Sequence, residues 1–144
     1  MATKIFVNLP VKDLNRSVEF FTKLGFSFNP YFTDESCTCM VVSESIYVML
    51  LVEDRFKDFT RKPICDATKA TEVLLCLDAE NREAVDELVQ KAVAAGGTLY
   101  AEPMENECMY GHSFADPDGH QWEIMYMDVS ALPPEAIGRA AAQV

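Results

Sequence analysis

The sequence predicts an α+β fold in which two βαβββ modules form one cupped mixed sheet with helices on its outer face. An internal repeat is the first reason, because residues 4–11 and 70–77 both read as a strand that runs into a helix, at an offset of 66. Residues 39–51 and 113–125 read as hairpins and repeat at an offset of 74. Corresponding positions of the two copies are therefore expected to occupy equivalent places.

Length and composition agree with one domain of this kind. The chain has 144 residues, of which 49% are hydrophobic, enough for a packed core. We expect a single domain over 1–144 that divides into module one (4–52), a charged connector (53–69), module two (70–127) and a tail (128–144).

The helix is the clearest element of module one. Leu14, Val18 and Phe21 recur at helical spacing and Gly25 is a typical C-cap, which predicts a helix over 15–24. The strands of this module are expected at 4–11, 26–32 (bent by Pro30), 37–43 and 46–52.

Module two repeats the same order. Its helix is expected at about 80–95, and its strands at 71–77, 98–102, 109–115 and 120–127. The turn before the last strand is Asp116-Pro117-Asp118-Gly119, with proline second and glycine fourth. A helical turn is expected in the connector at 54–59, and a short helix in the tail.

Strand alternation predicts which side chains face the helices. In the first strand these are Ile5, Val7, Leu9 and Val11, and in its copy Val73, Leu75 and Leu77. Phe6 and Glu72 then correspond to each other on the opposite, concave face, as do Met49 and Glu123 in the hairpins. A carboxylate on the apolar strand around Glu123 needs a cation, a hydrogen-bond donor or water beside it.

Charge and cysteine usage narrow the partners. The net charge of -11 repels nucleic acid and anionic membranes, so neither is expected, and a cationic or neutral small molecule is mildly favoured. No apolar run is long enough to span a membrane, and the N-terminus does not resemble a signal peptide. Five cysteines without C-x-x-C spacing are typical of reduced thiols, which predicts a cytoplasmic protein.

Three stretches carry a resemblance to a known family. They are Val11 to Phe21 at the first strand-to-helix junction, Leu24-Gly25-Phe26 at the helix exit, and Asp116 to Glu123 at the last turn and strand. With the repeat, the chain resembles the vicinal-oxygen-chelate superfamily, which includes glyoxalase I, bleomycin-resistance proteins, fosfomycin-resistance enzymes and extradiol dioxygenases. Within it, the chain most resembles bacterial proteins labelled as predicted lactoylglutathione lyases. The resemblance implies a glyoxalase-like fold and a homodimer.

The resemblance also implies where a metal ion would be held. The four ligand positions of glyoxalase I correspond here to Phe6, Glu72, Met49 and Glu123. Phenylalanine has no donor atom, and the methionine thioether is a poor ligand for hard divalent ions. Glu72 and Glu123 alone would hold a hard ion weakly, so no cofactor is expected apart from a weakly bound divalent metal.

The same two carboxylates are the candidate catalytic groups. Glyoxalase-type isomerisation needs a base beside a carbonyl, a role open to Glu123 with Glu72 nearby, and an electrophile, which is missing if the metal is missing. Of the two histidines, His120 reads as a surface turn residue, and His112 as a strand histidine with a partner or as a pocket residue.

Three hypotheses therefore remain open. The first is a small-molecule binder that takes an amphipathic or cationic ligand in an aromatic cup, with a degenerate metal site. The second is a lactoylglutathione-lyase-like isomerase that uses Glu123 and Glu72 with an atypical ion. The third is a dimeric protein whose ancestral site has become core. The expected ligand pocket comprises Phe6, Asn8, Met49, His112, Phe114 and Met125.

Overall fold

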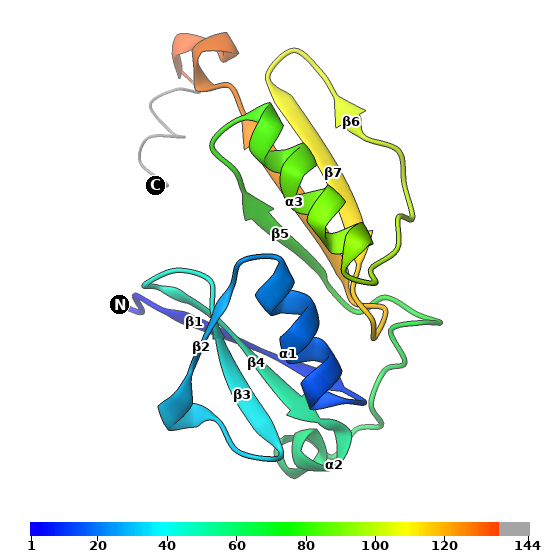
Figure 1. Ribbon diagram of the computed structural model, residues 1–144. Helices are drawn as coiled ribbons and strands as arrows, with labels where there is room; N and C mark the ends of the chain where they lie inside the picture. Colours follow the sequence, from blue (N-terminus) through cyan, green and yellow to red (C-terminus); the bar gives the residue numbers. More distant parts are fainter. Residues whose placement is uncertain (136–144) are drawn as a thin grey trace.

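The computed structural model describes residues 1–135 and contains two four-stranded mixed sheets (Figure 1). The strand orders are β1-β4-β3-β2 in module one and β5-β8-β7-β6 in module two, so the predicted α+β fold with two βαβββ modules is confirmed. In each module the first strand pairs in parallel with the last, and the other pairs are antiparallel.

Module one follows the predicted order closely. Its elements are β1 (Ile5–Val11), α1 (Leu14–Lys23), β2 (Ser27–Asn29), β3 (Cys37–Val41) and β4 (Ile46–Val52). Pro30 ends β2 and begins a 3-10 turn at Pro30–Phe32, which shortens the strand expected over 26–32. The connector holds α2 (Glu53–Phe56) and a 3-10 turn at Lys57–Phe59, where a helical turn was expected.

Module two departs from the prediction at two strands. Its elements are β5 (Leu74–Asp78), α3 (Arg82–Ala94), β6 (Met104–Glu105), β7 (Met109–Ala115) and β8 (Gln121–Met127). The strand expected over 98–102 does not form: Thr98 makes a single bridge to Ala115, and pairing resumes only at Met104. A 3-10 turn at Val129–Ala131 begins the tail, and the helix expected beyond it falls mainly on residues 136–144, outside the described part of the chain.

The two long helices, α1 and α3, begin at side-chain caps. Asp13 accepts a hydrogen bond from the N–H of Arg16, and Asn81 accepts one from the N–H of Ala84, so a free N–H is satisfied at each helix start. Gly25 follows α1 with a positive φ of 103°, as expected of a C-cap glycine. None of the helices in residues 1–135 has the length and apolar character that a bilayer-spanning helix requires.

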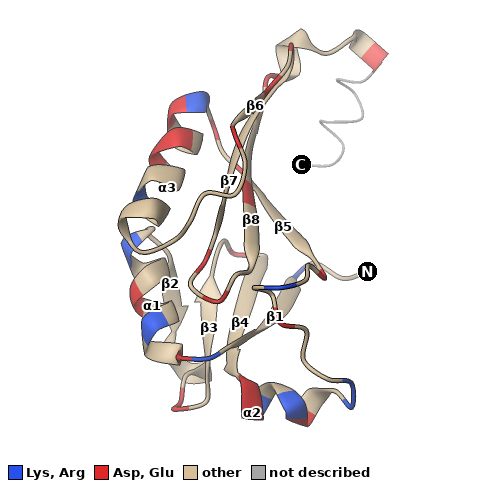
Figure 2. Cartoon of the chain, turned by 90° about the vertical axis from the view of Figure 1, so that its right-hand side faces the viewer, with Lys and Arg blue, Asp and Glu red and all other residues tan. Residues whose placement is uncertain are grey.

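The core joins the two modules. Figure 2 shows α1 and α3 on the same side of the sheets, and the apolar side chains beneath them form one cluster. Phe21 of α1 packs edge-on against Trp122 of β8 at 5.4 Å between ring centroids, and Phe20 lies 6.0 Å from Phe114 of β7. The predicted alternation holds for Leu9 and Val11, which are buried in this core.

Ile5 is an exception to that alternation. It faces the predicted side, but its side chain is 55% exposed. The two core positions of β1 lie at its C-terminal half, whereas Ile5 opens the strand. A side chain on the helix-facing side of a strand is therefore not always buried.

Candidate ligand-binding site

A pocket of about 340 Å³ lies at the open edge of the module-two sheet. Its lining combines apolar side chains with two carboxylates, and comprises Leu74, Tyr100, Ala101, Glu102, Met104, Gly111, His112, Ser113, Gln121, Glu123 and Met125. We call this cavity the edge pocket. Its volume is at the lower end of the range for small-molecule sites.

The missing strand opens this pocket. Between the Thr98–Ala115 bridge and the Met104–Gly111 pair, five residues (99–103) lie opposite only three of β7 (112–114). This excess makes the chain bulge away from the sheet, as extra residues in a ladder do. Because Ala115 exchanges both main-chain hydrogen bonds with Thr98, ladder alternation turns the N–H and C=O of Ser113 toward the same open edge.

Glu123 supplies a half-buried negative charge to the edge pocket, whereas the second lining carboxylate, Glu102, is exposed. Its neighbours along the strand, Trp122 and Ile124, are buried in the core, so alternation turns Glu123 to the opposite, concave face, as predicted. The side chain is half-buried and makes no ion pair with any residue of the described range 1–135. A half-buried carboxylate without a counter-ion favours a cation in the pocket.

The Glu123 carboxylate contributes to raised pKa values of two neighbouring groups. Burial raises the pKa of the Cys76 thiol above its ordinary value, and the negative charges of Glu123 and Asp78 raise it further. Burial also raises the pKa of the Tyr100 hydroxyl, with Glu123 adding to the shift and a hydrogen bond to Ser113 opposing it. Both groups therefore stay neutral beside Glu123 at neutral pH.

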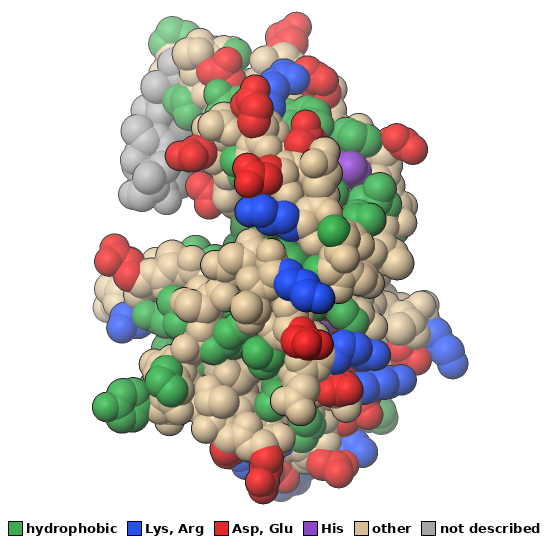
Figure 3. Space-filling model, in the orientation of Figure 1, with side chains coloured by type: hydrophobic (Ala, Val, Ile, Leu, Met, Phe, Trp, Pro, Cys, Tyr) green, Lys and Arg blue, Asp and Glu red, His purple; other side chains and the backbone are tan. Residues whose placement is uncertain are grey.

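The charge of the whole chain is concentrated in module two. Residues 70–127 contain twelve Asp and Glu but only Arg82 and Lys91 as basic residues, a balance of -10 out of the net -11. On the face drawn in Figure 3, acidic side chains gather over the upper part, where α3 lies. The field around the edge pocket therefore attracts cations.

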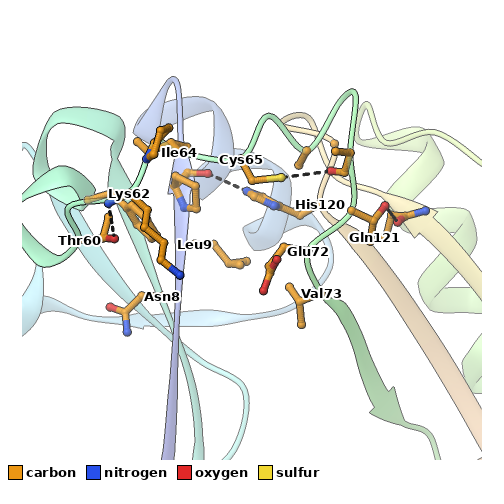
Figure 4. A pocket seen from close by; sticks show the side chains of 17 residues that line it. Asn8, Leu9, Thr60, Lys62, Ile64, Cys65, Glu72, Val73, His120 and Gln121 are labelled. Atoms are coloured by element: carbon orange, nitrogen blue, oxygen red, sulfur yellow. Dashed lines mark hydrogen bonds between the residues drawn. The ribbon is translucent and has the colours of Figure 1, made fainter.

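A second cavity, of about 300 Å³, lies where the connector meets both modules (Figure 4). Asn8, Glu72 and His120 are among its lining residues, together with much of segment 60–73. We call it the junction pocket. Glu72 precedes β5 and lines this cavity, so it is not brought together with Glu123.

The structure also corrects the alignment of the two modules. The capping residues Asp13 and Asn81 are 68 residues apart, and strand pairing joins Asn8 to Met49 in module one and Cys76 to Glu123 in module two. Asn8 thus corresponds to Cys76, and the expected offset of 66 is wrong by two residues. A two-residue shift keeps every side chain on the same face, so alternation does not reveal it.

This correction changes the partner of one predicted site residue. Phe6 corresponds to Leu74, not to Glu72, and both side chains are about half exposed on the concave faces, at 51% and 55%. Phe6 stacks on Tyr47 at 4.8 Å between centroids, and Met49 lies half-buried in the next strand of the same sheet.

Two further predictions about the site are wrong. Phe114, expected in the pocket, is 1% exposed and packs in the core between Phe20 and Trp122. His120, expected at the surface, is only 9% exposed, and its Nε2 lies 2.7 Å from the main-chain oxygen of Pro10 in module one. Only contacts between the modules reveal this burial.

His112 and Met125 are both among the residues that line the edge pocket, although the pairing of His112 with Ile124 turns the His112 side chain toward the helix face. The Nε2 atom of His112 is buried and has no hydrogen-bond partner within residues 1–135, so the expected partner is not found there. Tyr100 was missed by sequence reasoning because residues 98–102 read as a strand, whereas Cys76 could be placed on this face from alternation alone.

Comparison with known proteins supports the fold and the family. Residues 3–43 match a family model described as bleomycin resistance protein-like, N-terminal. A hypothetical protein from S. aureus is similar at 30% identity, with a TM-score of 0.74 over 88% of this chain and 95% of that one. No curated protein sequence matches the chain.

Two further solved structures share the fold at lower identity. A glyoxalase/bleomycin resistance protein/dioxygenase family enzyme from Burkholderia phytofirmans is 22% identical, with a TM-score of 0.71 over 85% of this chain and 96% of that one. A fosfomycin resistance protein from Listeria monocytogenes is 16% identical, with a TM-score of 0.66 over 91% and 98%. The chain belongs to the vicinal-oxygen-chelate superfamily.

The residues of this superfamily member do not fit the metal ion that the family resemblance implies. Glu123 pairs with Cys76, four residues beyond Glu72, so the main chain at Glu72 lies about 13 Å further along an extended chain than the residue paired with Glu123. Within residues 1–135, no three His, Cys, Asp or Glu side chains are grouped as metal ligands. Of the four positions that the resemblance implies, Phe6 offers no donor atom, Met49 offers only a thioether, and the two carboxylates line different cavities, which gives too few donor atoms for a divalent ion in one protomer.

Proposed function

We propose that this protein binds a small amphipathic cation in the edge pocket. Glu123 is the observation that supports the proposal most strongly, because its half-buried negative charge has no ion-pair partner among residues 1–135, and apart from the exposed Glu102 the cavity is largely apolar. A ligand cation would neutralise Glu123, and the ligand's apolar body would pack on Leu74, Met104 and Met125.

The open sheet edge adds a polar contact to the apolar surface. The N–H and C=O of Ser113 face the pocket and suit a ligand that carries an amide or hydroxyl group beside its cation. A hydrogen bond to a charged group contributes about 1.5–3 kcal/mol, and a neutral one about 1 kcal/mol. Glu123 is therefore expected to dominate the polar part of the affinity.

The isomerase alternative has less support from the geometry. It requires Glu72 and Glu123 to act on one substrate, but the two side chains line different cavities of the protomer. It also requires an electrophile at the substrate carbonyl, and the donor set of one protomer does not hold a metal ion for that role. The likeness to lactoylglutathione lyases therefore contributes no residue-level mechanism here.

The binding proposal is tested with benzyltrimethylammonium as the cationic probe and N-benzylacetamide as its neutral counterpart. We expect the cation to bind more tightly in calorimetric titrations, and Glu123→Gln to weaken its binding about tenfold by removing the charge attraction, without affecting the neutral compound. Glu80→Gln is the matched control, because Glu80 is exposed and does not line the pocket. Equal binding of both probes, or no effect of Glu123→Gln, would contradict the proposal.

We also propose that the protein forms a homodimer through its concave faces. Phe6 and Leu74 leave about half of their apolar side chains exposed on these faces, which a second copy would cover. Light scattering after size-exclusion chromatography tests this proposal. We expect twice the 16.1 kDa mass of the chain, and a shift toward the monomer when Phe6 and Leu74 are both replaced by Ser.

A further inference from the structure

The junction pocket is built from three segments that are far apart in the sequence. They are the end of β1, the turn before β8 with the first residue of that strand, and segment 56–73. Most of its lining is apolar, and includes Leu9, Pro10, Phe56, Pro63, Ile64 and Val73. The cavity of about 300 Å³ is separate from the edge pocket, with which it shares only Gln121.

Two side chains of opposite charge face each other across this pocket. Figure 4 shows the ammonium group of Lys62 and the carboxylate of Glu72 pointing toward one another from opposite sides, with the Asn8 amide nearby. Neither Lys62 nor Glu72 makes an ion pair with any residue in the part of the chain that the structure describes. The pocket therefore offers one positive and one negative group at the entrance to an apolar cavity.

The segment that carries Lys62 is held in place by its own hydrogen bonds. The carboxylate of Asp66 accepts hydrogen bonds from the N–H and hydroxyl of Thr68, and its main-chain oxygen accepts one from Ala70. The N–H of Lys62 donates to the hydroxyl of Thr60. The main chain at Ala67 packs closely on Gly119. A Cβ added to Gly119 would come within 2.9 Å of the main-chain carbonyl of Ala67.

We propose that the junction pocket is a second ligand site, for a small zwitterion with an ammonium group, a carboxylate and an apolar body. Lys62 would bind the carboxylate, Glu72 the ammonium group, and the apolar lining the body of the ligand. A ligand of this class matches both charges at once, whereas a simple cation or anion leaves one of them without a partner. The volume accommodates a molecule of the size of an apolar amino acid.

The test titrates the full chain with L-leucine, 4-methylpentanoate and 3-methylbutylamine, and follows amide shifts in ¹H–¹⁵N NMR spectra. We expect saturable shifts at Ala67, Ala70 and Gly119, and a dissociation constant for leucine at least fivefold lower than for the other two probes. Lys62→Met is expected to raise the value for leucine to that of the amine. Glu72→Gln is expected to raise it to that of the acid.

Matched variants separate this effect from a general change of charge. Lys69→Met and Glu80→Gln alter exposed charges that do not line the pocket, and are expected to leave leucine binding unchanged. The charge-swapped double variant Lys62→Glu/Glu72→Lys keeps both signs present and is expected to bind leucine better than either single variant. Absence of saturable shifts with leucine, equal binding of the three probes, or shifts confined to the edge pocket would overturn the proposal.

Discussion

The Nε2 atom of His120 lies 2.7 Å from the main-chain oxygen of Pro10, and this contact joins the last turn of module two to the first strand of module one. A second contact runs beside it, because the carboxylate of Asp118 accepts hydrogen bonds from the N–H of Lys12 and the hydroxyl of Ser17. Arg16 adds an ion pair to the same carboxylate at 3.2 Å. The turn at 116–119, which is part of the family resemblance, therefore also connects the two modules through hydrogen bonds and an ion pair.

Replacing Asp118 is expected to weaken this connection. Asp118→Ala removes the acceptor of the Lys12 N–H and leaves the buried Ser17 hydroxyl without that partner, so the free energy of unfolding should fall by about 2–3 kcal/mol. Urea denaturation followed by circular dichroism measures the change. Asp58→Ala breaks only an exposed ion pair and should cost about 0.5 kcal/mol or less. Similar losses in the two variants would contradict this assignment.

A core mutation in module one is expected to lower the stability of module two as well. Phe21 is 1% exposed and contacts Trp122 of the other module, so Phe21→Ala should lower the free energy of unfolding by about 3–5 kcal/mol. Trp122 fluorescence reports on module two, and it should shift to the same lower urea midpoint as circular dichroism. Phe59→Ala, at a 66% exposed position, is the control. Two separate transitions would show that the shared core does not couple the modules.

The pH dependence of Cys76 reports on the charge of Glu123. Burial and the Glu123 carboxylate raise the pKa of the thiol above 9.0, so less thiolate is present at any pH below that value, and alkylation by iodoacetamide should be slow at pH 8. Glu123→Gln removes a negative charge, lowers the pKa and should speed the reaction. Peptide mass spectrometry follows Cys76 separately from the other cysteines. An unchanged rate would mean that the carboxylate does not act on this thiol.

Gly111 is expected to control the size of the edge pocket. A Cβ at this position would come within 2.8 Å of Cε and 2.9 Å of Sδ of Met125, so Gly111→Ala should displace this flexible side chain. The cost in stability should be about 1 kcal/mol, because methionine adapts easily. Binding of benzyltrimethylammonium should weaken several-fold in calorimetric titrations. Adding Met125→Ala should relieve this crowding and recover part of the affinity, although the ligand then loses its contact with Met125, and a double variant as weak as the single one would contradict this explanation.

Much of the fold follows from the sequence itself. The repeat predicts two βαβββ modules, and local signals such as the apolar spacing of α1 and the glycine after it place that helix to within one residue. Alternation correctly places Leu9 and Val11 in the core and Glu123 on the opposite face. These features depend on neighbours only a few residues apart, so they can be read without knowledge of the fold.

What only the tertiary structure decided is the register and the contacts between modules. Alternation has a period of two, so it does not distinguish an offset of 66 from one of 68, and only strand pairing shows that Phe6 matches Leu74 and that Glu72 lies apart from Glu123. The burial of His120 and the bulge at residues 99–103 likewise depend on segments distant in the chain. Local chemistry therefore fixed the faces of the strands, and long-range packing fixed which residues meet.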